Sequence, residues 1–148
     1  MKEQELRNFV RKMHENQRLG VLVSRRGIYP YPTLVAFYNS PDLSTIICAT
    51  SVNTRKYENI TKNPHISFMI NNAQNAPDDV SVSSVITAFG IATCSERDED
   101  INDIISNLEK KHPVLLDFFR APSTRFILMH VERYQIVSQF QNVQELIP

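Results

Sequence analysis

The most informative part of the chain is residues 48–68, which read CATSVNTRKYENITKNPHISF. An apolar run typical of a strand gives way to small hydroxyl-bearing residues, then to Arg55 and Lys56, and then to a short helix that ends at Asn63-Pro64. Residues 65–70 return to an apolar pattern with strand character. The stretch therefore predicts a strand, a helix start and a second strand in close succession.

The predicted helix start combines features that suit an anion. A helix N-terminus presents unpaired backbone N–H groups and the positive end of the helix dipole. Here it also carries the hydroxyls of Thr50, Ser51 and Thr54 and two adjacent cations. Arg55 can hold a phosphate through two parallel hydrogen bonds, and Lys56 adds a point charge. The alternative interpretation is a capped surface helix whose Arg55 and Lys56 side chains point into water.

The rest of the chain predicts more strands than helices. Apolar residues recur at helical spacing in residues 1–18 and again in residues 98–111, so we expect two amphipathic helices there. Residues 53–62 predict the short helix described above. Strands are expected at residues 19–24, 33–38, 45–50, 65–70, 80–93, 125–131 and 134–140.

This order of elements indicates a fold class. Consecutive strands with few helices between them favour an antiparallel β-barrel with helices at its rim over a βαβ sheet. The 148 residues are the size of one domain, and we expect a single mainly β domain over residues 1–148. Gly90, inside the long predicted strand, indicates a bulge or a close backbone approach.

Composition excludes several functions. The chain carries 16 Lys and Arg against 16 Asp and Glu, so no basic excess favours nucleic acid or an anionic membrane. No apolar run is long enough for a membrane span, and no secretory signal follows the first residues, so we expect a cytoplasmic protein. Cys48 and Cys94 are expected to be buried free thiols. The four histidines lack metal-ligand spacing, so no metal site is predicted.

Residues 48–68 resemble the pyridoxamine 5′-phosphate oxidase-like superfamily of flavin-binding split barrels. The shared pattern is a strand, a Thr-Arg-Lys motif at residues 54–56, a short helix, an Asn-Pro and another strand. Residues 33–38 and 83–93 are similar to two further strands of that superfamily. The resemblance implies an antiparallel Greek-key split barrel and a homodimer that binds two FMN molecules between its subunits.

The resemblance also implies where each part of FMN would lie. The expected cofactor-binding residues are Thr54, Arg55 and Lys56 at the phosphate, Ala49, Thr50 and Ser51 along the ribityl chain and ring edge, Thr33, Leu34 and Val35 beside the isoalloxazine ring, and Ser84, or its neighbour Val85, from the second subunit.

The chain departs from the oxidase that names the superfamily. That enzyme has an Arg at the start of the strand that here begins at Pro32-Thr33, and commonly a Gln where this chain has Val85. It also has a C-terminal Arg-x-His motif for its substrate, which residues 131–140 lack. Oxidation of vitamin B6 is therefore not expected.

The sequence leaves two functions open. The first is an FMN-dependent oxidoreductase that acts on an unidentified small molecule, in which the cofactor supplies the chemistry and no catalytic acid or base is predicted. The second is a non-catalytic carrier or sensor that binds flavin or haem. A deazaflavin is a further possible cofactor.

Overall fold

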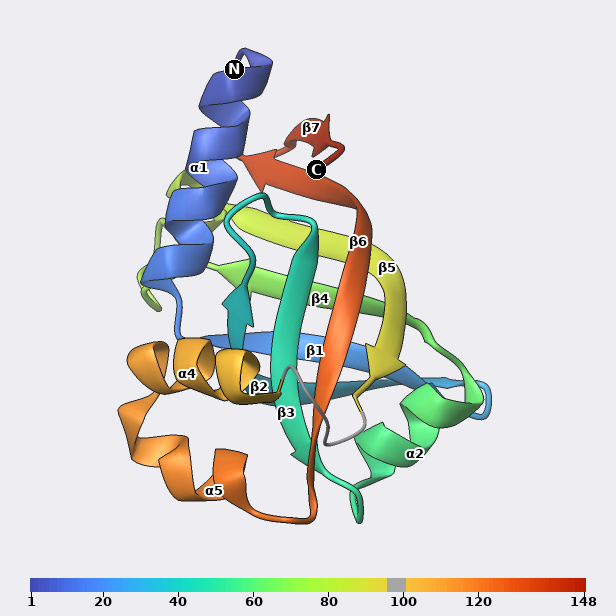
Figure 1. Ribbon diagram of the computed structural model, residues 1–148. Helices are drawn as coiled ribbons and strands as arrows, with labels where there is room; N and C mark the ends of the chain where they lie inside the picture. Colours follow the sequence, from blue (N-terminus) through green and yellow to red (C-terminus); the bar gives the residue numbers. More distant parts are fainter. Residues whose placement is uncertain (96–100) are drawn as a thin grey trace.

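The strands of the computed structural model close into an antiparallel β-barrel (Figure 1). The structure describes residues 1–95 and 101–148. Six strands form the barrel in the order β3-β2-β1-β4-β5-β6, and pairing between β3 and β6 closes it, while β7 extends the sheet beyond β6. The strands are β1 (Leu19–Arg26), β2 (Tyr29–Asn39), β3 (Thr45–Ser51), β4 (His65–Asn71), β5 (Val85–Cys94), β6 (Thr124–Ser138) and β7 (Asn142–Leu146).

The strand order confirms the predicted fold class. Three consecutive strands, β1 to β3, pair as hairpins, and β4 returns to lie beside β1, which is the Greek-key arrangement. Along β1, β4 and β5 every second side chain is buried, as expected for strands with one face toward a core. The mainly β barrel with peripheral helices is therefore as the sequence predicts.

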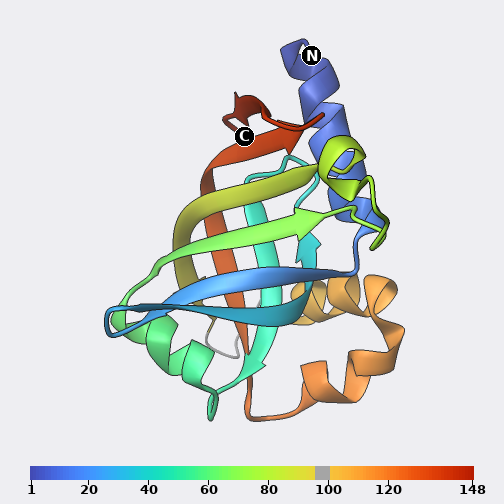
Figure 2. The ribbon, with the colours of Figure 1, turned by 180° about the vertical axis from the view of Figure 1, so that it is seen from behind.

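The helices lie around the barrel (Figures 1 and 2). They are α1 (Glu3–Asn16), α2 (Arg55–Lys62), α3 (Asp79–Val82), α4 (Ile101–Lys111), the 3-10 turn η1 (Pro113–Leu115) and α5 (Leu116–Arg120). Helices α1 and α2 lie toward the two ends of the barrel, and α4 and α5 pack on the outer face of β3 and β6. Leu6, Val10 and Met13 of α1 join the main core, and Ile105 and Leu108 of α4 join a second cluster with Phe119 and Phe126. The expected helix at 98–111 is described from Ile101 onward, and its residues 98–100 lie outside the described residues.

The end of the chain differs from the prediction of two strands at 125–131 and 134–140. One strand, β6, runs from Thr124 to Ser138. The polar pair Glu132-Arg133 suggested a break, but β6 continues through it with a β-bulge: Phe89 pairs with Arg133 and Gly90 with Val131, so Glu132 is the extra residue. The turn comes later, where Gln139, Phe140 and Gln141 all have positive φ, a conformation their residue types do not predict.

Two other boundaries also differ. The strand expected over residues 80–93 begins only at Val85, because residues 79–82 form the short helix α3, with the Asp79 carboxylate accepting hydrogen bonds from Gln74 and Ala76. The strand expected over 33–38 begins earlier, at Tyr29. Pro30 and Pro32 are tolerated there because β2 pairs with β3 only over Phe37–Asn39, which leaves one side of the earlier residues without a strand partner.

Gly90 lies at a close approach of β5 and β6, as its place within a strand predicts, and a Cβ atom added there would overlap the backbone carbonyl oxygen of His130. We therefore expect Gly90→Ala to lower the free energy of unfolding by about 1–3 kcal/mol, the usual cost of overpacking, measured by urea unfolding. Gly27→Ala is the matched control, because Gly27 has open space around it and only the cost of its positive φ, 62°. A Gly90→Ala midpoint equal to that of wild type would contradict the close approach.

No helix in the part of the chain that the structure describes combines the length and the apolar character needed to cross a membrane.

Candidate cofactor site

The junction between β3 and α2 is built on the barrel wall. The last residues of β3, Ala49 to Ser51, pair with residues 124–126 of β6, so the position where the chain leaves the barrel is fixed. The backbone N–H of Val52 then donates to the Ser123 carbonyl at 2.9 Å, and that of Thr54 donates to the Ser51 carbonyl at 3.2 Å. The tight turn places α2 directly beyond the end of β3.

Thr54 is the N-cap of α2. Its hydroxyl oxygen accepts a hydrogen bond from the backbone N–H of Tyr57 at 3.3 Å, and the same hydroxyl donates to the Ser51 carbonyl at 2.9 Å. The hydroxyl of Thr50 is buried and lies 2.6 Å from that of Thr54. Thr50 and Thr54 therefore hold the start of the helix in place, and the Thr50 side chain is turned into the protein.

Arg55 and Lys56, the first two residues of α2, have free backbone N–H donors. The backbone N–H groups of Arg55 and Lys56 have no hydrogen-bond acceptor among the described residues, as is normal for the first turn of a helix. The Arg55 side chain is exposed and that of Lys56 is half-buried. An open hollow of about 420 Å³ lies here, lined by Val52, Asn53, Thr54, Arg55, Tyr57, Glu58 and Thr61. The hollow thus offers N–H donors and the Arg55 guanidinium to an anion, whereas the predicted phosphate-binding residue Lys56 is not among the residues that line it.

The predicted ring-binding residues lie where β2 and β3 separate. Their ladder ends at the pair Phe37–Cys48. Residues 33–35 continue along β2 and pair with β1, and residues 49–51 continue along β3 and pair with β6. The structure therefore places these two groups on adjacent strands past the last β2–β3 pair, where the backbone of each has one side without a strand partner. Leu34 is 66% exposed, whereas Val35 is buried.

Ser84 is not near the other predicted residues within one chain. It precedes Val85, which pairs with Asn71 at the far end of β4, whereas α2 leads into the near end of β4 at His65. A seven-residue strand is roughly 20 Å long, so Ser84 lies at the opposite end of the barrel from α2. Its backbone N–H donates to the Asn72 side-chain oxygen at 2.7 Å.

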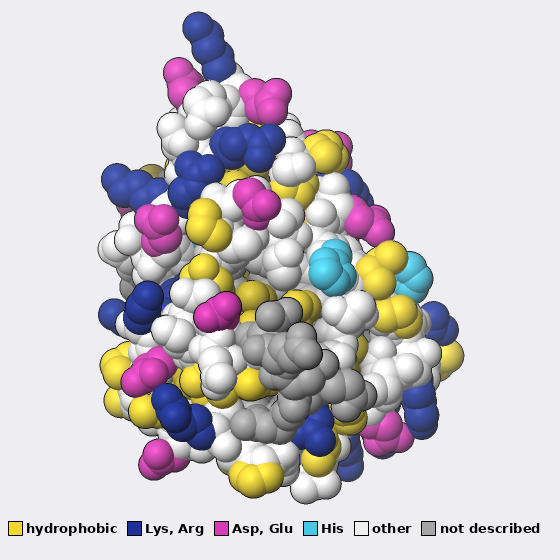
Figure 3. All heavy atoms as spheres, viewed as in Figure 1, with side chains coloured by type: hydrophobic (Ala, Val, Ile, Leu, Met, Phe, Trp, Pro, Cys, Tyr) yellow, Lys and Arg dark blue, Asp and Glu magenta, His cyan; other side chains and the backbone are white. Residues whose placement is uncertain are grey.

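Charges around α2 are only partly paired. The Glu58 carboxylate lies 2.9 Å from Lys62 and 3.9 Å from Arg26, and the hydrogen bond and charge of Lys62, with help from Arg26 and Arg55, lower the pKa of Glu58. Over the face in Figure 3 the described Lys and Arg side chains are interspersed with Asp and Glu.

The cysteine beside the site has no reactive character. Burial raises the pKa of Cys48 to about 12, so its thiol stays protonated at neutral pH. Both cysteines are free, and Cys94 is half-buried rather than buried as expected. Within residues 1–95 and 101–148 no group of three or more His, Cys, Asp or Glu side chains is placed to hold a metal ion.

The sequence did not predict a second hollow, which lies between α2 and the β1–β2 hairpin and shares Glu58 with the first. It measures about 900 Å³, and its lining comes from the β1–β2 hairpin and from α2. Asn59 and Lys62 lie four and seven residues after Arg55, so helical spacing could have placed them on one face of α2. No local pattern indicated that the hairpin would face them. The lining residues are Arg25, Arg26, Gly27, Ile28, Tyr29, Tyr31, Glu58, Asn59, Lys62 and Asn63.

The closed Greek-key barrel of antiparallel strands is the architecture of the split barrels. The family described as Pyridoxamine 5′-phosphate oxidase matches residues 3–138. The chain therefore belongs to the pyridoxamine 5′-phosphate oxidase family. No curated protein matches it in sequence.

Solved structures show the same fold. A Listeria innocua protein, provisionally assigned as a pyridoxamine 5′-phosphate oxidase, is 24% identical with a TM-score of 0.69. The match covers 89% of this chain and 98% of that protein. A heme binding protein of Mycobacterium smegmatis is 13% identical with a TM-score of 0.83; 95% of this chain is covered, but only 57% of that protein. HutZ, the heme storage protein of Vibrio cholerae, is 13% identical with a TM-score of 0.75. The match covers 89% of this chain and 93% of HutZ. At these identities the similarity establishes the fold alone.

Proposed function

We propose that the chain binds FMN and acts as an FMN-dependent oxidoreductase on a small molecule. The start of α2 is the observation that carries this proposal, because free N–H donors lie beside the Arg55 and Lys56 side chains there. A phosphate monoester brings about −1.5 to −2 charges at neutral pH and three acceptor oxygens, which match this donor set. The donors fit a cofactor that ends in a phosphate.

In this proposal the chain binds and orients the cofactor. Arg55 and Lys56 hold the phosphate, while Thr54 keeps the first turn of α2 in place for it. The free backbone edges at residues 33–35 and 49–51 hold the ring and the ribityl chain. When bound, FMN supplies hydride or electron transfer.

We also propose that a second copy of the chain completes the site. Figure 2 shows β1, β4 and β5 crossing the molecule without a helix over their outer face. The register aligns Leu34, Val21 and Met69 in one row on that face, although outward positions of an antiparallel sheet are usually polar. A second copy on this face would cover apolar surface and could bring its own Ser84 to the cofactor, which one chain alone cannot do.

The dimer has a direct test. We expect Met69→Asp to convert a wild-type dimer into a monomer, because it would place a carboxylate within an apolar interface. Light scattering measures the mass, and Gln4→Asp, which adds the same charge on exposed α1, should leave the dimer intact. A wild-type protein that is monomeric at micromolar concentration would contradict the proposed interface.

The cofactor assignment is tested by adding FMN to the purified protein, removing free FMN, and recording the visible spectrum. Retained flavin absorption that is bleached by NADH or NADPH and returns in air would support the oxidoreductase. Flavin that is retained but does not turn over would favour a carrier or sensor. A protein that retains no flavin would overturn the proposal.

A haem carrier or store is the second candidate, because two of the similar structures are named as heme proteins. His65 and His130 are exposed on the barrel surface, and the register places both opposite Ile91. His14 and His112 are buried and bond to backbone carbonyls, so they are not available as ligands. A haem titration of wild type and of the double variant His65→Ala/His130→Ala would test this candidate. Haem absorption that depends on these histidines, without flavin binding, would favour it.

A further inference from the structure

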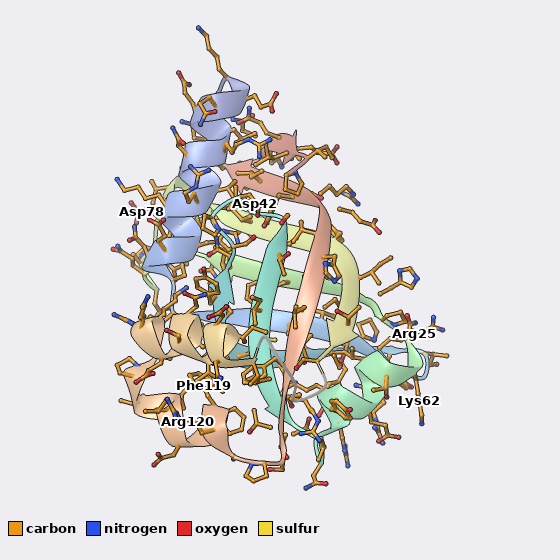
Figure 4. The ribbon with its side chains drawn as sticks, viewed as in Figure 1. Arg25, Asp42, Lys62, Asp78, Phe119 and Arg120 are labelled. Carbon is orange, nitrogen blue, oxygen red and sulfur yellow. The ribbon has the colours of Figure 1, made fainter. Side chains whose placement is uncertain are left out.

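The hollow of about 900 Å³ between the β1–β2 hairpin and α2 does not include any of the residues predicted to hold FMN. Its volume is typical of a site for a small organic molecule. Figure 4 shows Arg25, from the hairpin, and Lys62, from α2, at the same end of the molecule. Two elements that are distant in sequence therefore form the walls of one site.

The hollow has an excess of positive charge. Arg25, Arg26 and Lys62 line it, and Glu58 is the acidic residue among its lining side chains. Lys62 contacts Glu58 at 2.9 Å, whereas the Nε of Arg25 donates to the Gly27 carbonyl at 2.6 Å. The two terminal nitrogens of Arg25 have no partner among the described residues. Because the chain as a whole has no net charge, this local excess points to an anionic ligand.

The walls also offer apolar surface. Ile28 is 80% exposed and Tyr29 is 71% exposed, and Tyr31 lies two residues further along the same strand. Large apolar and aromatic side chains at the edge of a hollow provide flat contact surface for a ligand ring. An inorganic ion would use none of this surface.

A buried amide adds a directional contact. Asn59 is 3% exposed, and its amide nitrogen donates to the Ser24 hydroxyl at 3.1 Å, which fixes the side chain. The side-chain oxygen Oδ1 of Asn59 accepts no hydrogen bond from the described residues, and Asn59 lines the hollow. Asn59 can therefore accept a hydrogen bond from an N–H or O–H group of a ligand.

We propose that this hollow is a second ligand site, which binds planar aromatic molecules that carry a carboxylate or a similar anion. The Arg25 guanidinium binds the anionic group through parallel hydrogen bonds, and Arg26 adds a second cation. Tyr29, Tyr31 and Ile28 contact the ring, and Asn59 contacts a polar substituent. The site requires neither FMN nor a second subunit for binding.

The probe for this site is 2-naphthoate, with the neutral 2-naphthamide as its uncharged counterpart, each titrated calorimetrically into protein with and without FMN. Wild type should bind the acid about tenfold more tightly than the amide, the usual effect of one charge-assisted hydrogen bond. Arg25→Gln should remove most of this preference and leave the weak binding of the amide unchanged. The preference should also decrease at high salt.

Arg7→Gln is the matched control, since Arg7 is on α1 and outside this hollow. Circular dichroism of each variant would confirm that it is folded. Equal binding of acid and amide by wild type, or an unchanged preference in Arg25→Gln, would overturn the second site. FMN binding is measured separately, so failure of the flavin proposal is distinguishable from failure of this one.

Discussion

Replacing both Arg55 and Lys56 by alanine should weaken FMN binding by several kcal/mol. Each side chain would lose a hydrogen bond to a charged phosphate oxygen, and such a bond contributes about 1.5–3 kcal/mol. Both residues lie in the first turn of α2, with Arg55 exposed, so the change should leave the barrel intact. Calorimetric titration with FMN measures the loss, and riboflavin, which has no phosphate, should bind wild type and the double variant equally.

A matched double variant shows that the effect is local. Arg7→Ala/Lys12→Ala also removes two cations from a helix, but from α1, away from the start of α2. It should keep the wild-type affinity for FMN. If the Arg55→Ala/Lys56→Ala variant binds FMN as wild type does, the phosphate is not held at α2.

Acid should destabilise the protein through His14, which is 1% exposed and packs against the rings of Phe37 and Tyr134. Burial and, to a smaller extent, the charge of Lys111, partly offset by a hydrogen bond to the Val10 carbonyl, lower the pKa of His14 from 6.5 to about 4. Since the unfolded chain binds the proton more readily, stability is complete above about pH 6.5 and is lost as the pH falls toward 4. The loss at pH 4.5 should be about 2–3 kcal/mol.

Urea unfolding at pH 7.5 and at pH 4.5 measures this loss. His112 also has a pKa lowered by burial, so the contribution of His14 must be isolated by a variant. His14→Gln keeps a donor near the Val10 carbonyl but does not titrate, and its stability should differ less between the two pH values. An equal pH dependence in wild type and variant would show that His14 does not carry the effect.

Local sequence patterns predicted most of the strands but not how the strands pair. A few neighbouring residues are enough to show a strand pattern, either alternating apolar and polar side chains or a continuous apolar run. Strands predicted in this way at residues 19–24, 45–50 and 65–70 are all present. The irregularity at Gly90 was predicted, because a glycine inside a strand pattern indicates a bulge or a close backbone approach, and both are found there. That β6 continues through Glu132 and Arg133 was not predicted, because a polar pair in an exposed turn and one opposite a bulge look alike in the sequence. Pairing between β3 and β6 depends on the whole barrel and has no local signal.

The candidate cofactor site was partly visible in the sequence for a similar reason. Thr54, Arg55 and Lys56 are adjacent, so their position at a helix start follows from one short segment. Ser84 lies apart from them, and its predicted role depends on a second subunit. The second hollow is lined by both Arg25 and Lys62, which are 37 residues apart in the sequence. Only the tertiary fold brings them together, so no rule of local spacing predicts this hollow.

Closure of the barrel by β3 and β6 has a consequence for biosynthesis. As the chain leaves the ribosome, β1 to β4 can pair early, but the edge of β3 that pairs with β6 in the barrel has no partner until β6 emerges. Such contacts between distant segments make folding slow, and the exposed edge can pair with other nascent chains. Chains truncated within β6 should therefore accumulate as aggregates, whereas full-length chains bury that edge within their own barrel.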